Sequence, residues 1–147
     1  MKKKRFPRVT IDAIIMENGK ILLIQRGKPP FIGSWALPGG HIDLGEIVED
    51  AVIREIKEET NAEVKIDKLF NVYSHPDRDP RGHYITIVYS CSIKDKNQKI
   101  LGGDDAIKAQ FFDIEEINKI KLAFDHKEII NDFLSFKNGK RDSFVAI

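Results

Sequence analysis

The sequence predicts a mixed α+β fold organised as one domain. Its 147 residues, of which 41% are hydrophobic, are enough for one compact core. Most apolar segments are short, rich in β-branched and aromatic residues and bounded by Gly, Pro, Asn or Asp, which is typical of strands. Helical spacing occurs once in the middle of the chain and once near its end. Strands and helices therefore do not alternate regularly, and this argues against a repeated βαβ unit.

The predicted strands begin with a hairpin. Residues 9–15 and 20–25 flank Asn18-Gly19, and both turn residues tolerate the positive φ that a two-residue hairpin turn requires. Five more short strands are predicted at residues 35–37, 64–66, 69–73, 83–93 and 109–112. The loops 75–82 and 95–105 between the later strands are polar.

Two helices are predicted, at residues 47–60 and 125–136. Glu49 and Asp50 suit the first turn of the earlier helix, because acidic side chains are favoured near a helix N-terminus. Asp125 is the expected N-cap of the later helix, and Glu128 three residues on completes the pattern of a capping box.

Composition excludes several classes of function. The 24 basic and 23 acidic side chains leave a net charge of +1, so no overall field favours nucleic acid or a membrane. No apolar run approaches the roughly 20 residues that span a bilayer. The single cysteine, Cys91, excludes an internal disulfide and fits a reducing cytosol, which predicts a cytoplasmic protein. We expect one domain over residues 1–147, with a basic, solvated start at 1–7 and a C-terminal tail at 137–147.

The helix predicted at 47–60 carries clustered glutamates beside an apolar stripe. At ~100° per residue the stripe comprises Val48, Val52, Ile53 and Ile56. Glu55 and Glu59 are one turn apart, with Glu58 beside them. Crowded carboxylates that lose water have raised pKa values unless a cation compensates, and Mg²⁺ typically binds a few carboxylates together with substrate phosphate. The alternative is a solvated helix, because Asp50, Arg54 and Glu58 have the i, i+4 spacing of surface ion pairs.

Glycines before this helix let the backbone approach a ligand at the helix N-terminus. The stretch from Gly40 to Ala62 resembles the Nudix box, which is glycine, five residues, glutamate, seven residues, then Arg-Glu-apolar-x-Glu-Glu-x-Gly-apolar. The residues in register are Gly40, Glu46, Arg54, Glu55, Ile56, Glu58 and Glu59. The late glycine of the pattern is Asn61 here, and asparagine is the next-best residue for a left-handed helix end.

The Nudix resemblance implies an α/β/α sandwich around a mixed sheet, and hydrolysis of a nucleoside diphosphate linked to another moiety. It also implies Mg²⁺ as cofactor, with Mn²⁺ as the alternative. The implied metal ligands are Glu58, Glu59, Glu55 and the carbonyl of Gly39, with Glu55 alternatively orienting the base. Arg54 would orient the glutamates, and the resemblance also implies that it pairs with Glu46. Many relatives are homodimers, so self-association is allowed, although no residue pattern here requires it.

The general base of family members often lies outside the box. The acidic loop Gly102-Gly103-Asp104-Asp105 holds the best candidates, Asp104 and Asp105, without a preference between them. The alternative is a plain turn, in which Gly and Asp are also favoured.

The loop at residues 75–83 bears on the substrate. Arg78 and Arg81 carry guanidinium forks that suit phosphate oxygens, and His83 is a further polar candidate. The alternative is a surface loop with Asp–Arg pairs. The segment Arg-Asp-Pro-Arg-Gly-His is similar to one in the ADP-ribose pyrophosphatases of the Nudix superfamily. Outside this loop, Arg26 can reach a phosphate or remain an exposed arginine, and Trp35 can stack on a base or belong to the core.

The leading hypothesis is an ADP-ribose pyrophosphatase that releases AMP and ribose 5-phosphate from its small-molecule nucleotide substrate. The second is another Nudix pyrophosphatase, acting on oxidised nucleoside triphosphates, dinucleoside polyphosphates or sugar nucleotides. The third is a non-catalytic ADP-ribose sensor. We expect no nucleic-acid or membrane partner for the first two, and the retained glutamates argue against the third.

Overall fold

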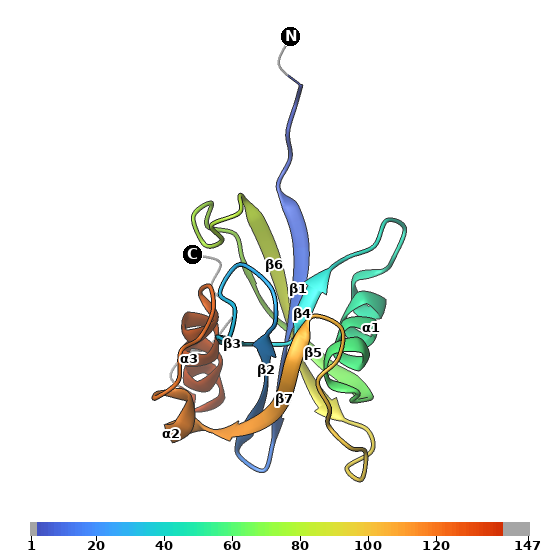
Figure 1. Ribbon diagram of the computed structural model, residues 1–147, viewed down its shortest axis with the longest axis vertical. Coiled ribbons are helices and arrows are strands. Elements are labelled where there is room, and N and C mark those ends of the chain that lie inside the picture. The colour runs from blue at the N-terminus through green and yellow to red at the C-terminus, as the bar shows by residue number, and fades with distance from the viewer. Residues whose placement is uncertain (1–2, 140–147) are drawn as a thin grey trace.

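The computed structural model describes residues 3–139. In chain order its elements are β1 (Arg8–Glu17), β2 (Lys20–Arg26), β3 (Trp35–Ala36), β4 (Gly39–His41), α1 (Val48–Thr60), β5 (Val64–Tyr73), β6 (Tyr84–Ile93), β7 (Ala106–Asp113), α2 (Ile114–Ile117) and α3 (His126–Lys137) (Figure 1). Among residues 3–139, no helix combines the length and the hydrophobicity that spanning a bilayer requires.

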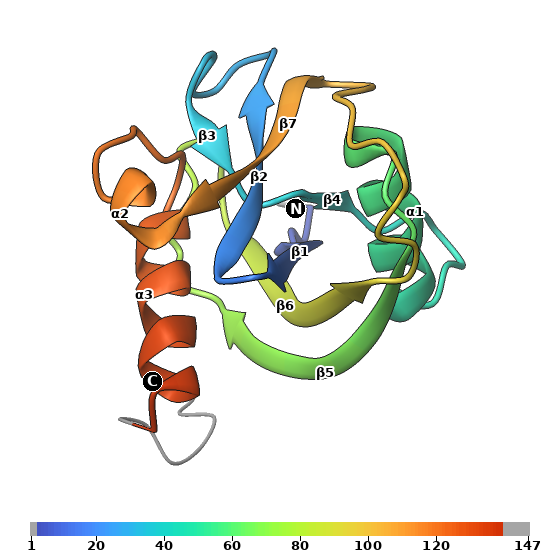
Figure 2. The same cartoon turned by 90° about the horizontal axis from the view of Figure 1, so that it is seen from below.

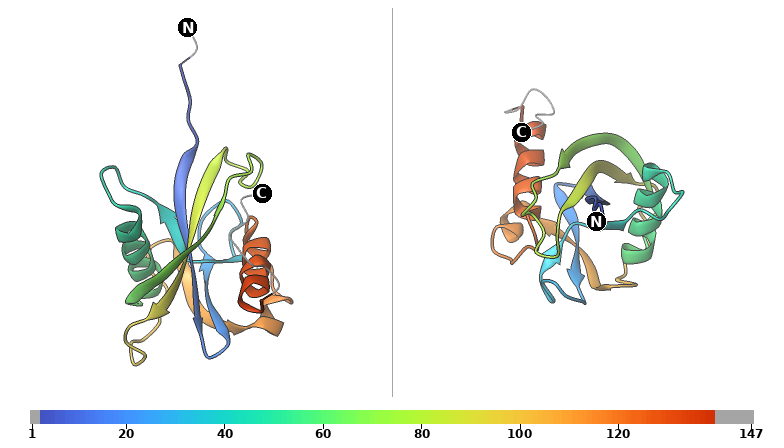
Figure 3. Two further views of the ribbon diagram at one scale, coloured as in Figure 1. Left: turned by 180° about the vertical axis from the view of Figure 1, so that it is seen from behind. Right: turned by 90° about the horizontal axis from the view of Figure 1, so that it is seen from above.

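The strands form one seven-stranded mixed sheet with helices on both sides. The order is β3-β2-β1-β6-β5, with β4 also paired to β1 and β7 to β2. Strands β1 and β6 run parallel, whereas the other pairs are antiparallel. Helix α1 covers one side, and α2 and α3 lie on the other (Figures 1, 2 and 3). The predicted α+β class and the α/β/α sandwich are confirmed.

Each side of the sheet packs its own apolar core. Successive residues of β1 serve both, because side chains alternate across a strand. Ile11 and Ile15 belong to the core beneath α1, whereas Ile14 belongs to the core beneath α3, and all three are fully buried. Burial on both faces explains why β1 reads as an almost continuous apolar run rather than as an alternating one.

The predicted strands at residues 64–66 and 69–73 are in fact one strand. Their separation in the sequence comes from two irregularities in the pairing of β5 with β6, at Ile66/Lys68 and at Leu69/Asn71. A bulge places an extra residue on one strand and so breaks the two-residue hydrophobic period. The hairpin at Asn18-Gly19 is confirmed, with positive φ at both residues.

Two helix predictions need correction. Asp125 occupies the N-cap position of α3, but its carboxylate makes no cap hydrogen bond, so the predicted capping box with Glu128 is wrong. Instead the carboxylate accepts both prongs of the Arg78 guanidinium, at 2.7 and 2.9 Å. In α1, Ile53 is 38% exposed rather than part of the buried stripe, and Ala51 is buried in its stead. The short elements β4 and α2 were not predicted.

Candidate active site

A polar cavity of about 140 Å³ opens where β4 and α1 approach the loops before β3, β7 and α3. Acidic and basic side chains share its lining. The acidic ones are Asp12, Glu55, Glu59, Asp79, Asp104 and Asp105. The basic ones are Arg26, Lys28, Arg78 and Arg81, with His41 and His126 as further polar groups. The structure therefore brings together segments that are far apart in the sequence.

Helix α1 places its glutamates at this cavity. Its acidic first turn and the basic Lys57 in its last turn both suit the helix dipole. Asn61 ends the helix at φ 64°, and its N–H donates to the Lys57 carbonyl, as predicted for a left-handed cap. Val52 and Ile56 anchor the apolar face in the core, and Glu55 and Glu59, each three residues after one of them, line the cavity.

Glu59 is a buried carboxylate, with 7% of the residue exposed. Its Oε1 accepts the N–H of Gly39 at 2.8 Å, which ties α1 to β4. Burial raises the pKa of Glu59 well above its usual value, and the charges of Glu55 and Asp12 raise it further. Within residues 3–139 no Lys, Arg or His forms an ion pair with this carboxylate.

Glu55 lies one turn before Glu59 and is also largely shielded from solvent. Burial raises its pKa, whereas a 2.9 Å hydrogen bond from Arg54 Nη1 lowers it. The carboxylate faces Gly40 of β4, where an added Cβ would lie 2.6 Å from the carboxyl carbon of Glu55. A side chain at this position would displace the Glu55 carboxylate from its present place.

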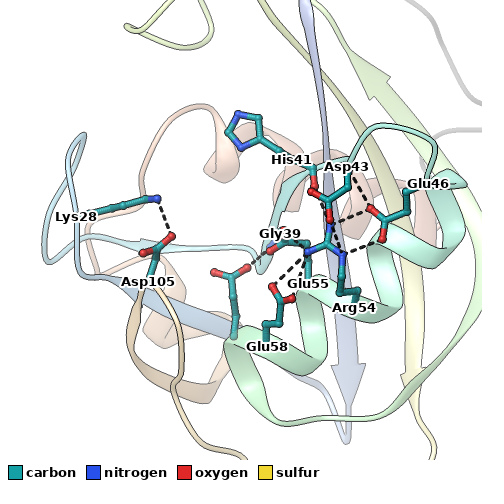
Figure 4. A network of polar contacts seen from close by, with 10 residues as sticks. Lys28, Gly39, His41, Asp43, Glu46, Arg54, Glu55, Glu58 and Asp105 are labelled. Atoms are coloured by element: carbon teal, nitrogen blue, oxygen red, sulfur yellow. Dashed lines mark hydrogen bonds and ion pairs between the residues drawn. The ribbon is translucent and has the colours of Figure 1, made fainter.

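Arg54 is the centre of a hydrogen-bond network (Figure 4). Its fork binds both oxygens of Glu46, at 2.8 and 2.9 Å, and this contact is the main reason that the pKa of Glu46 falls to about 2. The same guanidinium reaches Glu55 and Glu58, and it donates to the carbonyl of His41 at 3.1 Å. The predicted pairing of Arg54 with Glu46 is present.

Glu58 differs from its two neighbours. It forms the i, i+4 ion pair with Arg54 at 3.3 Å, its side chain is 40% exposed, and it does not contribute to the cavity lining. The structure thus brings Glu55 and Glu59 together in the cavity lining. Glu58 stays outside this lining and contacts Arg54 (Figure 4).

The arginines predicted to bind substrate have different partners. Arg78 lines the cavity, but its side chain is 5% exposed and is held by Asp125. Arg81 forms a two-pronged contact with Asp79, at 2.8 and 3.1 Å. Arg26 is half-buried at the cavity and donates to main-chain carbonyls. Both loop arginines therefore make the Asp–Arg pairs that the sequence left open as the alternative.

Trp35 and His83 are not brought to the cavity lining. The ring of Trp35 packs edge-on against Phe112, with centroids 4.6 Å apart, beside the core under α3. Nε2 of His83 lies 2.9 Å from the carbonyl of Ser74 and bridges the two ends of its own loop. Trp35 therefore contributes to packing, and His83 stabilises its own loop.

Asp104 and Asp105 both line the cavity, on the loop that precedes β7. Asp105 forms an ion pair with Lys28 at 2.6 Å, which joins this loop to the β2–β3 loop (Figure 4). Asp104 has a φ of 54°. Gly103 lies against the end of α1, where an added Cβ would be 2.6 Å from the carbonyl oxygen of Glu58. The acidic loop is thereby held next to the glutamates.

Sequence reasoning missed a buried polar group beneath β4. Asp12 accepts a 2.6 Å hydrogen bond from the Thr86 hydroxyl and lies 3.7 Å from Nε2 of His126. Nδ1 of His126 accepts the N–H of Leu37 at 3.0 Å, which leaves the ring proton on Nε2, facing Asp12. Burial raises the pKa of Asp12 and lowers that of His126. The one sequence feature that could have indicated this group is Asp12 itself, a charged residue within the apolar stretch of β1.

Residues 6–133 match the family model of the NUDIX domain. The chain belongs to the Nudix family. This Nudix chain is 51% identical over 142 residues to an ADP-ribose pyrophosphatase of Methanocaldococcus jannaschii, and the match covers 95% of the chain and 82% of that protein.

Two solved structures are similar in fold. One is a bifunctional NMN adenylyltransferase/ADP ribose pyrophosphatase of Francisella tularensis, complexed with AMP and a Mn ion, with a TM-score of 0.79 and 29% identity over 91% of this chain and 43% of that one. The other is the NUDIX domain of NrtR from Shewanella oneidensis, complexed with ADP ribose, with a TM-score of 0.76 and 27% identity over 87% and 86% of the two chains.

Nudix hydrolases use divalent metals, and the cavity residues fit such an ion. Glu55 and Glu59 place two carboxylates of raised pKa at one cavity, and carboxylate oxygens are the ligands that hard divalent cations prefer. A cation would offset the mutual repulsion and the desolvation that raise both pKa values. Over the described part of the chain, no three His, Cys, Asp or Glu side chains already converge as ligands of one ion; Arg54 binds both Glu55 and Glu58.

Proposed function

We propose that this Nudix chain hydrolyses ADP-ribose to AMP and ribose 5-phosphate, and that Mg²⁺ is the ion it uses, with Mn²⁺ as a substitute. The observation that carries the proposal is that partly buried Glu55, buried Glu59 and Arg26 line one cavity. The high identity to an ADP-ribose pyrophosphatase supports the choice of substrate within the family.

Glu55, Glu59 and the carbonyl of Gly39 are proposed to hold the ion, with Glu58 as a further ligand once it exchanges Arg54 for the metal. When bound, the ion neutralises charge on the diphosphate and lowers the pKa of a bound water. The hydrogen bond between the N–H of Gly39 and Glu59 keeps the glycine carbonyl and the carboxylates in register. Arg54 acts on Glu55 and Glu46 and is proposed as a positioning residue.

Arg26 and Arg81 are proposed to bind the diphosphate oxygens, since both guanidinium groups line the cavity. Arg78 is proposed to act indirectly, because its ion pair with Asp125 joins the loop after β5 to the start of α3.

Asp104 is proposed as the general base in preference to Asp105. Asp105 is already bound by Lys28 at 2.6 Å, whereas the charge of Asp104 acts on Glu55 across the cavity. A base must lie within reach of the water proton that it accepts. Asp104→Asn should therefore reduce kcat more than Asp105→Asn does. Equal losses in the two variants would remove the preference.

The substrate assignment is tested with a panel of nucleoside diphosphate compounds. Initial rates are measured with Mg²⁺ for ADP-ribose, sugar nucleotides, dinucleoside polyphosphates and normal and oxidised nucleoside triphosphates, with AMP and ribose 5-phosphate identified by chromatography. We expect the highest kcat/KM for ADP-ribose. Faster turnover of any other compound would transfer the assignment to the second hypothesis, and binding of ADP-ribose without turnover would favour a sensor. Self-association stays a prediction, which light scattering tests.

A further inference from the structure

Two phenylalanines that pack against each other, of which only Phe124 lines the cavity, have an unusual backbone conformation. Phe31 and Phe124 have φ values of 63° and 52°. Asn18 and Asn61 also have positive φ, but asparagine tolerates this conformation at turns and helix ends. For a bulky side chain such as phenylalanine, a positive φ is strained. Such strain persists where the surrounding structure enforces it, and it is concentrated at functional sites. The position of Phe124 therefore requires an explanation.

Phe124 lies in the cavity lining, two residues before α3, and two guanidinium groups contact its ring. The Cζ atom of Arg26 is 5.0 Å from the ring centroid, and the Cζ atom of Arg81 is 5.4 Å from it. Both distances are within the range of cation–π attraction. Phe31 packs edge-on against the same ring, with centroids 4.9 Å apart, and supports it from the β2–β3 loop.

The two arginines come from different parts of the chain and repel each other. Arg26 ends β2, whereas Arg81 lies in the loop before β6. Burial lowers the pKa of Arg26, and the charge of Arg81 lowers it further. Arg81 is partly neutralised by Asp79, but among residues 3–139 no carboxylate forms an ion pair with Arg26. Two like charges thus share one aromatic ring, on a cavity that has carboxylates elsewhere in its lining.

We propose that Phe124 is a positioning residue that holds the guanidinium groups of Arg26 and Arg81 together as one cradle for the diphosphate of the substrate. The identity of that anion rests on the proposed function, whereas the cradle itself rests on the two ring contacts. An anion between the arginines attracts both of them and so offsets their mutual repulsion. Holding the two guanidinium groups together in advance therefore favours substrate binding. Loss of the ring removes the attraction that offsets this repulsion, although Asp79 still holds Arg81 and the Pro30 carbonyl still holds Arg26, and it weakens substrate binding rather than the chemical step.

Three substitutions of Phe124 separate positioning from folding. Phe124→Leu removes the aromatic face but keeps an apolar side chain. Phe124→Gly removes the ring and suits the left-handed backbone, so it relieves strain while it abolishes the contacts. Phe124→Tyr keeps the ring and should restore the function. The matched control is Phe70→Leu, because Phe70 is a buried aromatic residue in the core under α3, remote from the cavity lining.

For ADP-ribose hydrolysis we expect Phe124→Leu and Phe124→Gly to raise KM about tenfold with kcat nearly unchanged, which corresponds to about 1.4 kcal/mol of binding. Phe124→Tyr should keep the wild-type KM. Phe70→Leu should lower the melting temperature without changing KM. An unchanged KM in both ring-deleted variants, or a KM that rises equally in Phe70→Leu, would overturn the proposal.

A binding measurement keeps this test separate from the test of the substrate. Calorimetric titration with inorganic diphosphate and Mg²⁺ measures the cradle without any turnover. We expect a Kd about tenfold higher in Phe124→Leu than in the wild type or in Phe124→Tyr. If the wild type does not hydrolyse ADP-ribose but this difference in Kd is present, the proposed substrate fails and the cradle stands. If ADP-ribose is hydrolysed and the three Kd values agree, the cradle fails alone.

Discussion

Replacing Glu59 by glutamine should make the protein more stable and far less active. Glutamine has the same shape, and its Oε1 can still accept the N–H of Gly39, so packing and the 2.8 Å hydrogen bond survive. What disappears is a negative charge at a residue that is 7% exposed. Because burial raises the pKa of Glu59, ionising it in the folded state costs about 1.4 kcal/mol for each unit by which that pKa exceeds the unfolded value.

The stability difference has a defined dependence on pH. At low pH Glu59 is protonated in both the folded and the unfolded state, so the wild type and Glu59→Gln should be equally stable. As the pH rises through the unfolded value of about 4.5, only the unfolded wild type ionises freely, and the wild type loses stability. At about pH 8 without divalent ions we expect the variant to be more stable by about 1–3 kcal/mol.

Divalent ions should reverse this order of stability and make the wild type the more stable protein. Mg²⁺ that binds the folded wild type stabilises it by linkage, whereas the variant gains less. Urea unfolding with EDTA and with Mg²⁺ measures both effects, and kcat should fall by about 10²–10³-fold or more. The control is Glu63→Gln, an exposed glutamate whose nearest cation, Lys57, is 3.9 Å away. A Glu59→Gln variant that is less stable than the wild type in EDTA, or one with near-normal turnover, would contradict the role of the Glu59 charge.

Three further predictions concern the neighbours of these carboxylates and the buried thiol. Arg54→Lys keeps the charge but cannot hold Glu46 and Glu55 with one planar fork, so kcat should fall about 10–100-fold in steady-state assays; unchanged kinetics would contradict the positioning role. Gly40→Ala places a Cβ 2.6 Å from the carboxyl carbon of Glu55 and should reduce kcat/KM about 10²-fold, whereas normal activity would show that the carboxylate is not needed there. Burial raises the pKa of the Cys91 thiol to about 12, so the folded protein should not react with a disulfide reagent at neutral pH until urea unfolds it; rapid reaction of the folded state would contradict this.

The regular parts of the fold could be predicted because local signals and tertiary packing agree there. The hairpin at Asn18-Gly19 and the end of α1 at Asn61 depend on backbone conformations that these residue types favour, and both predictions are confirmed. The bulges of β5 could not be predicted, because a bulge shifts the alternation on which strand prediction depends. The cap of α3 failed because Asp125 has a stronger partner, Arg78, from a distant loop.

The candidate site also has a part that the sequence predicts and a part that only the fold reveals. Its glutamates lie on one helix, so their spacing predicts their common face, and the structure brings Glu55 and Glu59 to one cavity. Phe124 and His126 come from the opposite end of the chain and match no local pattern, so only the fold reveals them. Trp35 shows the converse, since a residue type that suits base stacking instead packs against the core.

The most direct test of the central claim is a titration of Mn²⁺ followed by electron paramagnetic resonance, in which the signal of the free ion decreases when the ion binds. We expect the wild type to suppress this signal, and the double variant Glu55→Gln/Glu59→Gln to restore it while retaining the folded circular-dichroism spectrum. Equal Mn²⁺ binding by the folded double variant and by the wild type would show that these carboxylates do not hold the ion.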